Sequence, residues 1–322
     1  MATLAELRAK LAAQDQRQAG ARETDNAIYT FWNIPNDTTA TLRFLPDKDE
    51  SNTFFWQERQ MIRMPFPGVK GQDEAKAVTV NVPCTEMWGD TCPVHAEIRP
   101  WFKDPTLEDI ARKYWKKRSY IFQGLVINDP LGEESPPENP IRRFVINPSI
   151  YKIIKAALMD PDMENLPVDY VNGTDFRLTK TQKGQYADYS TSNWARRERG
   201  LSEDELEAIE TNGLFTLSDY LPKKPSTEGV EIIYNMFQAS VDGELYDPDK
   251  WSDWYRPFGV TASSKSTPVS TESTESVKSA SVPIETEVVE TTANDASTDS
   301  SSASAEDILA MIRDRAKAKD TA

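Results

Sequence analysis

The sequence predicts a mainly β fold with helical insertions, in which short strands form a small barrel. Runs rich in β-branched and aromatic residues recur between residues 39 and 190. Most of these runs stop at a proline or at a turn sequence, as strands do. Helical patterns stand between the runs, but they do not alternate with them in the regular order of a parallel α/β sheet. Short strands interrupted in this way favour a barrel.

The first three predicted strands are each followed directly by a proline. They cover residues 39–45, 54–64 and 77–82. Proline has no backbone N–H to donate to a sheet, so it stands at the ends or edges of strands. The prolines therefore mark where these three strands end.

The later elements mix helices with strands. Apolar residues at helical spacing predict helices over residues 107–118, 149–159 and 202–210. Strands are predicted over residues 120–127 and 141–146. A hairpin is predicted from residues 176–181 and 186–190, which flank the turn at Lys183 and Gly184.

The chain divides into four predicted regions: an arm over 1–24, a core over 25–258, a linker over 259–303 and a helix over 304–322. All eight tryptophans fall in the core. The linker has no aromatic residue and is rich in serine and threonine. It buries too little apolar surface to offset its chain entropy, so we expect it to be disordered.

Both ends of the chain carry amphipathic patterns. In the arm, Leu4, Leu7 and Leu11 fall on one helical face, which predicts a docking arm for another chain, with a frayed terminus as the alternative. The predicted C-terminal helix has an apolar face of four residues: Ile308, Leu309, Met311 and Ile312. A lone amphipathic helix on a long tether is typical of an element that binds a partner protein.

The acidic excess is confined to the end of the chain. Residues 1–200 hold 27 Lys and Arg against 28 Asp and Glu, whereas residues 201–322 hold 10 against 24. The low pI of about 4.7 therefore does not exclude a nucleic-acid partner for the near-neutral front. An acidic tail can compete with a phosphate backbone for the same cations.

Interleaved cations and rings predict a nucleic-acid site. Residues 112–122 hold five cations and four aromatic rings, and further clusters lie near residues 142–144 and 180–199. Cations follow the phosphates of a single strand, and rings stack on its bases without regard to sequence. The candidate contact residues are Arg112, Lys113, Lys116, Lys117, Arg118, Tyr120, Arg142, Arg143, Phe144, Lys180, Tyr186 and Tyr189.

A second candidate site is a metal knuckle formed by Cys84, Cys92 and His95. Thiolate and imidazole are good zinc ligands, so we expect one Zn²⁺ ion. The chain has no other cysteine or histidine, so the fourth ligand must be a carboxylate or water. The carboxylate candidates are Glu58, Asp73, Glu86 and Asp90, and the sequence does not choose among them.

The sequence gives little support to an enzyme. His95-Ala96-Glu97 matches the H-x-E of zinc nucleobase deaminases, but the downstream P-C-x-x-C of those enzymes is missing. No phosphate-binding loop of the G-x-x-x-x-G-K-[ST] type occurs, and no G-x-G-x-x-G. No apolar run approaches the roughly 18–20 residues of a membrane span, so we expect no membrane partner.

Taken in order, several motifs resemble the helix-destabilising single-stranded DNA-binding proteins of T-even-like bacteriophages. The resemblance covers roughly residues 38–200. It rests on these segments: ATLRFLP at 40–46, the cysteines and histidine of 84–95, KKRSY at 116–120, LVINDP at 125–130, RRF at 142–144, YKII at 151–154 and GQYADY at 184–189.

This resemblance implies an OB-fold core, a five-stranded barrel, with an inserted zinc-knuckle subdomain. It also implies cooperative, sequence-tolerant binding of single-stranded DNA, self-association through the N-terminal arm, and recruitment of replication and recombination proteins by the C-terminal segment. The chain departs from the family in its knuckle, where His95 replaces the last cysteine and the upstream histidine is missing.

From the residues and the resemblance together, we expect a non-enzymatic protein that protects and organises single-stranded DNA. Its setting would be phage DNA replication, recombination and repair in the cytoplasm of the infected bacterial host. An RNA-binding translational repressor would use the same kind of surface and is the alternative. A zinc-dependent nucleic-acid enzyme is the less favoured rival.

Overall fold

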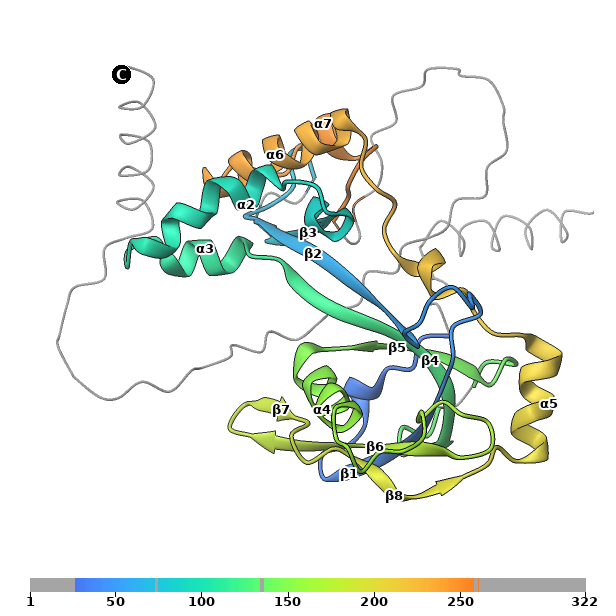
Figure 1. Cartoon of the computed structure of the whole chain (residues 1–322). Helices are drawn as coiled ribbons and strands as arrows, with labels where there is room; N and C mark the ends of the chain where they lie inside the picture. Colours follow the sequence, from blue (N-terminus) through green and yellow to red (C-terminus); the bar gives the residue numbers. More distant parts are fainter. Residues whose placement is uncertain (1–26, 73–74, 134–135, 258–259, 261–322) are drawn as a thin grey trace, which may run out of the picture. The chain divides into compact units, whose positions relative to one another are not determined.

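The computed structural model describes residues 27–72, 75–133, 136–257 and 260. The predicted arm, linker and C-terminal helix lie outside these residues. The chain forms two compact units, which Figure 1 shows with their elements labelled. Of the described residues, unit 1 holds those within 27–48, 122–145 and 156–215, and unit 2 holds those within 49–121, 146–155 and 216–260.

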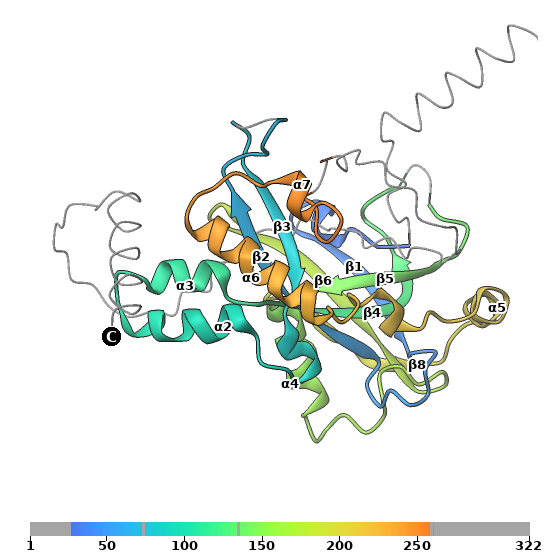
Figure 2. The ribbon, with the colours of Figure 1, turned by 90° about the horizontal axis from the view of Figure 1, so that it is seen from above.

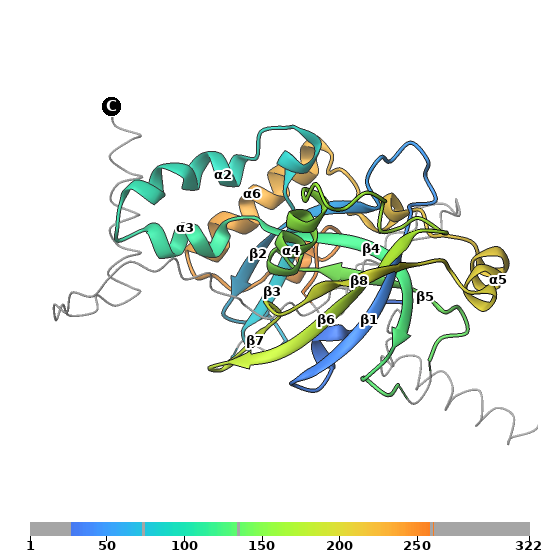
Figure 3. The ribbon, with the colours of Figure 1, turned by 60° about the horizontal axis from the view of Figure 1, so that its bottom comes forward.

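Unit 1 is built on a row of five strands in the order β5–β4–β1–β6–β8. β1 pairs antiparallel with both β4 and β6, and β6 pairs antiparallel with β8 and with the short β7. Figure 3 shows β1, β6 and β8 side by side. The strands are β1 (Thr38–Leu45), β4 (Lys117–Asn128, in unit 1 from residue 122), β5 (Ile141–Ile146), β6 (Gly173–Lys183), β7 (Tyr186–Asp188) and β8 (Asn193–Arg199).

The core of unit 1 is aromatic. The ring of Phe44 on β1 lies 4.9 Å from Phe122, 5.7 Å from Phe144 and 5.7 Å from Phe176, measured between ring centroids. Gly124 stands opposite Phe44 on β4, and a Cβ atom there would lie 2.1 Å from the carbonyl oxygen of Arg43. Only glycine lets the two backbones approach so closely.

Unit 2 packs helices on an antiparallel pair, β2 (Trp56–Phe66) and β3 (Val78–Pro83). Figure 2 looks down on α6, which lies over these two strands. Ile62 of β2, Val82 of β3 and Phe237 of α6 belong to one buried cluster. The helices of unit 2 are α2 (Pro93–Ile98), α3 (Glu108–Tyr114), α6 (Thr227–Val241), α7 (Pro248–Trp251) and the first part of α4 (Pro148–Leu158).

Shorter elements complete both units. Four 3-10 helices occur among the described residues: η1 (Phe31–Asn33), η2 (Thr85–Trp88), η3 (Arg99–Lys103) and η4 (Leu217–Tyr220). In unit 1, α5 (Glu203–Asn212) begins with a capping box, because Ser202 and Glu205 each accept the other's backbone N–H. The acidic first turn of α5 suits the positive end of its helix dipole.

The mainly β fold with helical insertions is confirmed, and the five-strand row supplies the strands of the expected barrel. Several boundaries differ. The predicted strands over 120–127 and 176–181 begin earlier than expected, at Lys117 and Gly173. The predicted helix over 107–118 ends at Tyr114, because Lys117 already opens β4. The predicted strand over 54–64 begins at Trp56 and does not end at Pro65, since it runs on to Phe66. The sequence patterns do not predict α2, β8, α6 or α7.

The buried ring of Phe44 should contribute strongly to stability. We expect Phe44→Ala to lower the free energy of unfolding by about 3–5 kcal/mol, because it leaves a cavity among three other rings. Urea denaturation followed by circular dichroism measures the change. Phe54→Ala is the matched control, since Phe54 is 57% exposed and should change stability little. Equal losses in both variants would contradict the packing described here.

Candidate nucleic-acid interface and metal centre

Three cations gather where β2 meets the start of β4 in unit 2. We call Arg59, Arg63 and Lys117 the cation cluster. The Arg59 Nε atom donates to Ser119 Oγ at 3.1 Å, which fixes Arg59 beside β4. Lys117 stands two residues before Ser119 and therefore on the same face of the strand. Arg59 and Arg63 share the alternating face of β2 in the same way.

Burial and mutual repulsion both oppose the charge of this cluster. Burial lowers the pKa of Arg59 and of Arg63. The pKa of Lys117 is lowered first by burial and then by the positive charge of Arg63. Lys117 is exposed, and its Nζ atom donates to the backbone carbonyl of Arg112 at 3.3 Å. An anion near Lys117 and Arg63 would lessen the repulsion between them. A phosphate backbone supplies such anions.

The opposite face of the same strands carries rings. Tyr120 stacks on Tyr151 with ring centroids 3.5 Å apart and an angle of 12° between the rings. Trp56 meets Tyr151 edge to face at 5.6 Å and packs against Phe54 at 4.9 Å. Tyr120 is buried by this packing, whereas Phe54 is 57% exposed. Of these rings, Phe54 is therefore well placed to meet a base from solvent.

The predicted cations of residues 112–118 have different surroundings. Arg112 is exposed and pairs with Glu108 one turn earlier on α3, and Lys113 is exposed beside it. Arg118 lies 3.4 Å from Glu58 and is half exposed. Lys116 is largely buried, and its Nζ atom lies 2.7 Å from Glu86. Lys116 thus belongs to the knuckle more than to an open surface.

In unit 1, most of the predicted contact residues hold the segment 27–34 against the sheet. Arg142 forms two bonds to Glu133, at 2.7 and 3.0 Å, and lies over the ring of Tyr29. The backbone of Arg143 pairs with residues 27 and 29. The Lys180 Nζ atom donates to the carbonyl oxygens of Trp32 and Ile34, at 2.6 and 3.1 Å.

The predicted rings of unit 1 divide into buried and exposed ones. Phe144 is fully buried, and Tyr189 packs edge to face on Phe31 at 5.7 Å. Both rings face the protein interior, so their predicted contact with DNA is not supported by an exposed surface. Tyr186 is 58% exposed at the β6–β7 turn. Exposed cations of the same unit are Arg177, Lys183, Arg196 and Arg197.

The sequence analysis does not single out Arg59 and Arg63. They lie in the predicted strand over 54–64, and their positions two residues either side of Met61 place them on one face. This alternation could have indicated that Arg59 and Arg63 share one face of the strand. The pairing of this strand with residues 117–119, which completes the cluster, is a long-range contact that alternation does not reveal.

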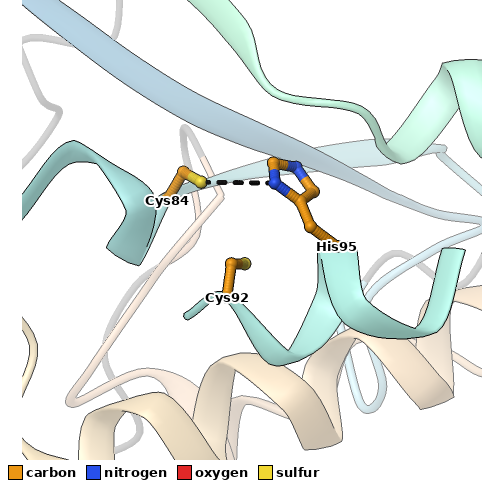
Figure 4. A group of neighbouring side chains, drawn as sticks. All are labelled: Cys84, Cys92 and His95. Carbon is orange, nitrogen blue, oxygen red and sulfur yellow. Dashed lines mark hydrogen bonds between the residues drawn. The ribbon is translucent and has the colours of Figure 1, made fainter. Parts of the chain in front are cut away.

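The three predicted metal ligands meet in unit 2. Figure 4 shows the side chains of Cys84, Cys92 and His95 pointing toward one another. Their ligand atoms all lie within 4.8 Å of one another, and all three residues are buried. Cys84 directly follows β3, Cys92 caps the start of α2, and His95 lies in that helix. The Cys84 Sγ atom is 3.6 Å from His95 Nδ1.

The pKa values of the Cys84 and Cys92 thiols are shifted in opposite directions. A hydrogen bond from Cys84 lowers the pKa of Cys92 to about 6, with help from the backbone and charge of His95. The hydrogen bond to Cys92 and burial raise the pKa of Cys84. The pair therefore favours one thiolate, and a thiolate is the form that binds metal.

These residues fit a zinc ion. Two sulfurs and one ring nitrogen form a donor set that zinc prefers, and burial excludes competing water. Cys84, Cys92 and His95 would hold the ion, which would cross-link the end of β3 to α2. The ring of His95 is already fixed, because it stacks on Trp115 at 4.5 Å.

Comparison with known families shows which family the chain belongs to. The family described as gp32 DNA binding protein like matches residues 36–237. The chain belongs to this family. The match includes the cation cluster, the metal ligands and every strand of both units. A comparison with curated proteins finds no match.

Membership in the gp32-like family has direct consequences. The family is one of DNA-binding proteins and not one of enzymes. The deaminase alternative accordingly has no support from the family. No membrane-spanning helix occurs in the part of the chain that the structure describes.

Lys180 offers a test of the anchoring contacts in this gp32-like chain. We expect Lys180→Met to lower the free energy of unfolding by about 1–3 kcal/mol, because two carbonyl oxygens lose a charged donor. Lys183→Met on the same strand is the control and should be nearly neutral, since Lys183 is exposed. Urea denaturation compares the two. A neutral Lys180 variant would show that the segment 27–34 does not depend on this contact.

Proposed function

We propose that this protein binds single-stranded DNA without sequence preference and cooperatively, and protects and organises it during DNA replication, recombination and repair. The setting would be a bacteriophage infection, in the cytoplasm of the bacterial host. Membership in a DNA-binding family supports the ligand class. The cation cluster is the observation that carries the proposal within this chain.

The cation cluster would bind the phosphates. Arg59 is held beside β4 by its hydrogen bond to Ser119, and Arg63 lies near enough to the exposed Lys117 for its charge to affect it. Each phosphate that they neutralise releases counterions, and affinity should therefore fall steeply as salt increases. Arg112 and Lys113 on the neighbouring α3 would extend the positive surface.

Exposed rings would stack on the bases. Phe54 and Tyr186 are more than half exposed, unlike Tyr120, Phe144 and Tyr189. A base stacked on a ring gains roughly 1–3 kcal/mol whichever base it is, which suits a protein that must coat any sequence.

Binding to one strand alone favours duplex melting by mass action. A protein that binds the unpaired strand but not the duplex shifts the equilibrium toward separated strands, and it needs no nucleotide hydrolysis. Self-association through the arm over 1–24 would make binding cooperative. The segment over 304–322 would recruit replication and recombination proteins. These two roles rest on the sequence patterns and on the family resemblance.

The phosphate contacts predict a change in salt dependence. We expect Lys117→Met or Arg63→Gln to weaken binding to oligo(dT) about five- to tenfold at low salt. Each variant should also reduce the slope of log affinity against log salt by about 0.7, the value for one lost phosphate contact on a single strand. Fluorescence anisotropy across a salt series measures both quantities.

Lys250→Met is the control for that experiment. Lys250 lies on α7, its side chain is 66% exposed, and it stands near Asp247 instead of other cations. Its replacement should leave the salt slope unchanged. A full salt slope in the Lys117 and Arg63 variants would show that the cation cluster does not bind phosphate. Tighter binding to oligo(U) than to oligo(dT) would favour the RNA-binding alternative.

A further inference from the structure

A carboxylate lies against the three metal ligands. Glu86 belongs to η2, the short helix between Cys84 and Cys92. Its Oε1 atom is 3.2 Å from the Nδ1 atom of His95, and its side chain is 18% exposed. The same Nδ1 atom is 3.6 Å from the sulfur of Cys84. Nδ1 therefore faces both a carboxylate and a sulfur.

The other acidic candidates are held elsewhere. Glu58 pairs with Arg118 and is 37% exposed. Asp90 pairs with Lys224 at 2.7 Å and is 50% exposed. Glu97 accepts hydrogen bonds from the side chains of Tyr234 and Gln238. Asp73 lies outside the described residues. Among the described candidates from the sequence, Glu86 is the one in contact with a ligand residue.

We propose that Glu86 is the fourth ligand of a zinc ion bound by Cys84, Cys92 and His95. In a tetrahedral zinc site, bond lengths of about 2.0–2.3 Å place neighbouring ligand atoms about 3.3–3.8 Å apart. The Cys84–His95 distance of 3.6 Å and the Glu86–His95 distance of 3.2 Å are close to these values. The carboxylate is not part of the group whose ligand atoms all lie within 4.8 Å, so coordination requires it to turn toward the sulfurs.

Two cations orient the Glu86 carboxylate. The Lys116 Nζ atom donates to Oε2 at 2.7 Å, and Arg99 donates to Oε1 at 2.9 Å. Burial opposes ionisation of Glu86, but the hydrogen bonds from Lys116 and His95 outweigh it and hold its pKa below the usual value. Partners of this kind fix the direction of a metal ligand. They also link the site to Lys116, which directly precedes β4.

Zinc binding at Nδ1 would change the protonation of the Nε2 atom of His95 and its hydrogen bond. The backbone N–H of Lys116 donates to Nε2 at 3.2 Å, so Nε2 carries a lone pair and the proton of the neutral ring is on Nδ1. Zinc at Nδ1 displaces that proton, and a neutral ring must then carry its proton on Nε2. The Lys116 N–H loses its acceptor as a result. Metal binding would thus rearrange the contact between α2 and the residue that precedes Lys117 of the cation cluster.

Metal titrations of the full chain test the ligand assignment without DNA, so their outcome does not depend on the proposed function. Wild type should bind one Zn²⁺ per chain, and Cys92→Ser should lose tight binding. We expect Glu86→Gln to lower zinc affinity at least tenfold in chelator competition. Asp90→Asn, an acid of the same knuckle, should stay within twofold of wild type. Circular dichroism checks that each variant folds.

Two results would overturn the assignment. One is a Glu86→Gln variant with wild-type zinc affinity and an unchanged spectrum after cobalt substitution. The other is a reduced wild-type chain that binds no zinc.

The single histidine of the chain gives a second measurement on the unaltered protein. Labelling histidine with ¹⁵N yields one imidazole signal pair, whose shifts report which nitrogen carries the proton. We expect the proton on Nδ1 without metal, and on Nε2 with the metal at Nδ1 after zinc is added. A ring whose signals do not change with zinc would rule out His95 as a ligand and, with it, the proposed site.

Discussion

The meeting of three cations at the junction of β2 and β4 is the constraint on which the account of DNA binding depends. Arg59, Arg63 and Lys117 come from strands far apart in the sequence, and the sheet forces them together. Burial lowers the pKa of all three, and the positive charge of Arg63 lowers that of Lys117 further. The large buried apolar cluster of unit 2 stabilises the fold and offsets this electrostatic cost. In the proposed function, an anionic polymer would offset this electrostatic cost when it binds at the cluster.

The basic residues of this chain serve two different purposes. In unit 1, Arg142 donates to a carboxylate and Lys180 donates to two backbone carbonyls. Lys180 thereby holds the segment 27–34 in place. In unit 2, Lys116 and Arg99 orient the carboxylate beside the metal ligands. Lys117 at the β2–β4 junction differs from both groups, since the positive charge of Arg63 adds to burial in lowering its pKa. It is at the cation cluster that we propose phosphates bind.

Much of the fold and part of the site could be predicted from the sequence. Prolines and alternating residues predict the strands, and the spacing of two thiols and an imidazole predicts the metal ligands. Both predictions succeed because each pattern lies within a short stretch of the sequence. Local patterns do not show which side chains are covered by distant segments. Phe144 and Tyr189 look like stacking rings in the sequence, yet they pack against residues 29–31. The sequence likewise does not show that Arg63 of β2 lies near Lys117 of β4, because this contact depends on how the strands pair. The choice of Glu86 over Glu58 or Asp90 needs the position of His95 in space.

The most direct test of the central claim is intrinsic fluorescence of the full chain with added oligo(dT), measured over a range of salt concentrations. Stacking of bases on aromatic side chains quenches emission, and counterion release makes the bound state sensitive to salt. The account predicts quenching at low salt that is lost progressively as salt increases. Emission that stays constant with oligo(dT) in dilute buffer, together with unchanged mobility of the DNA in a gel, would contradict it.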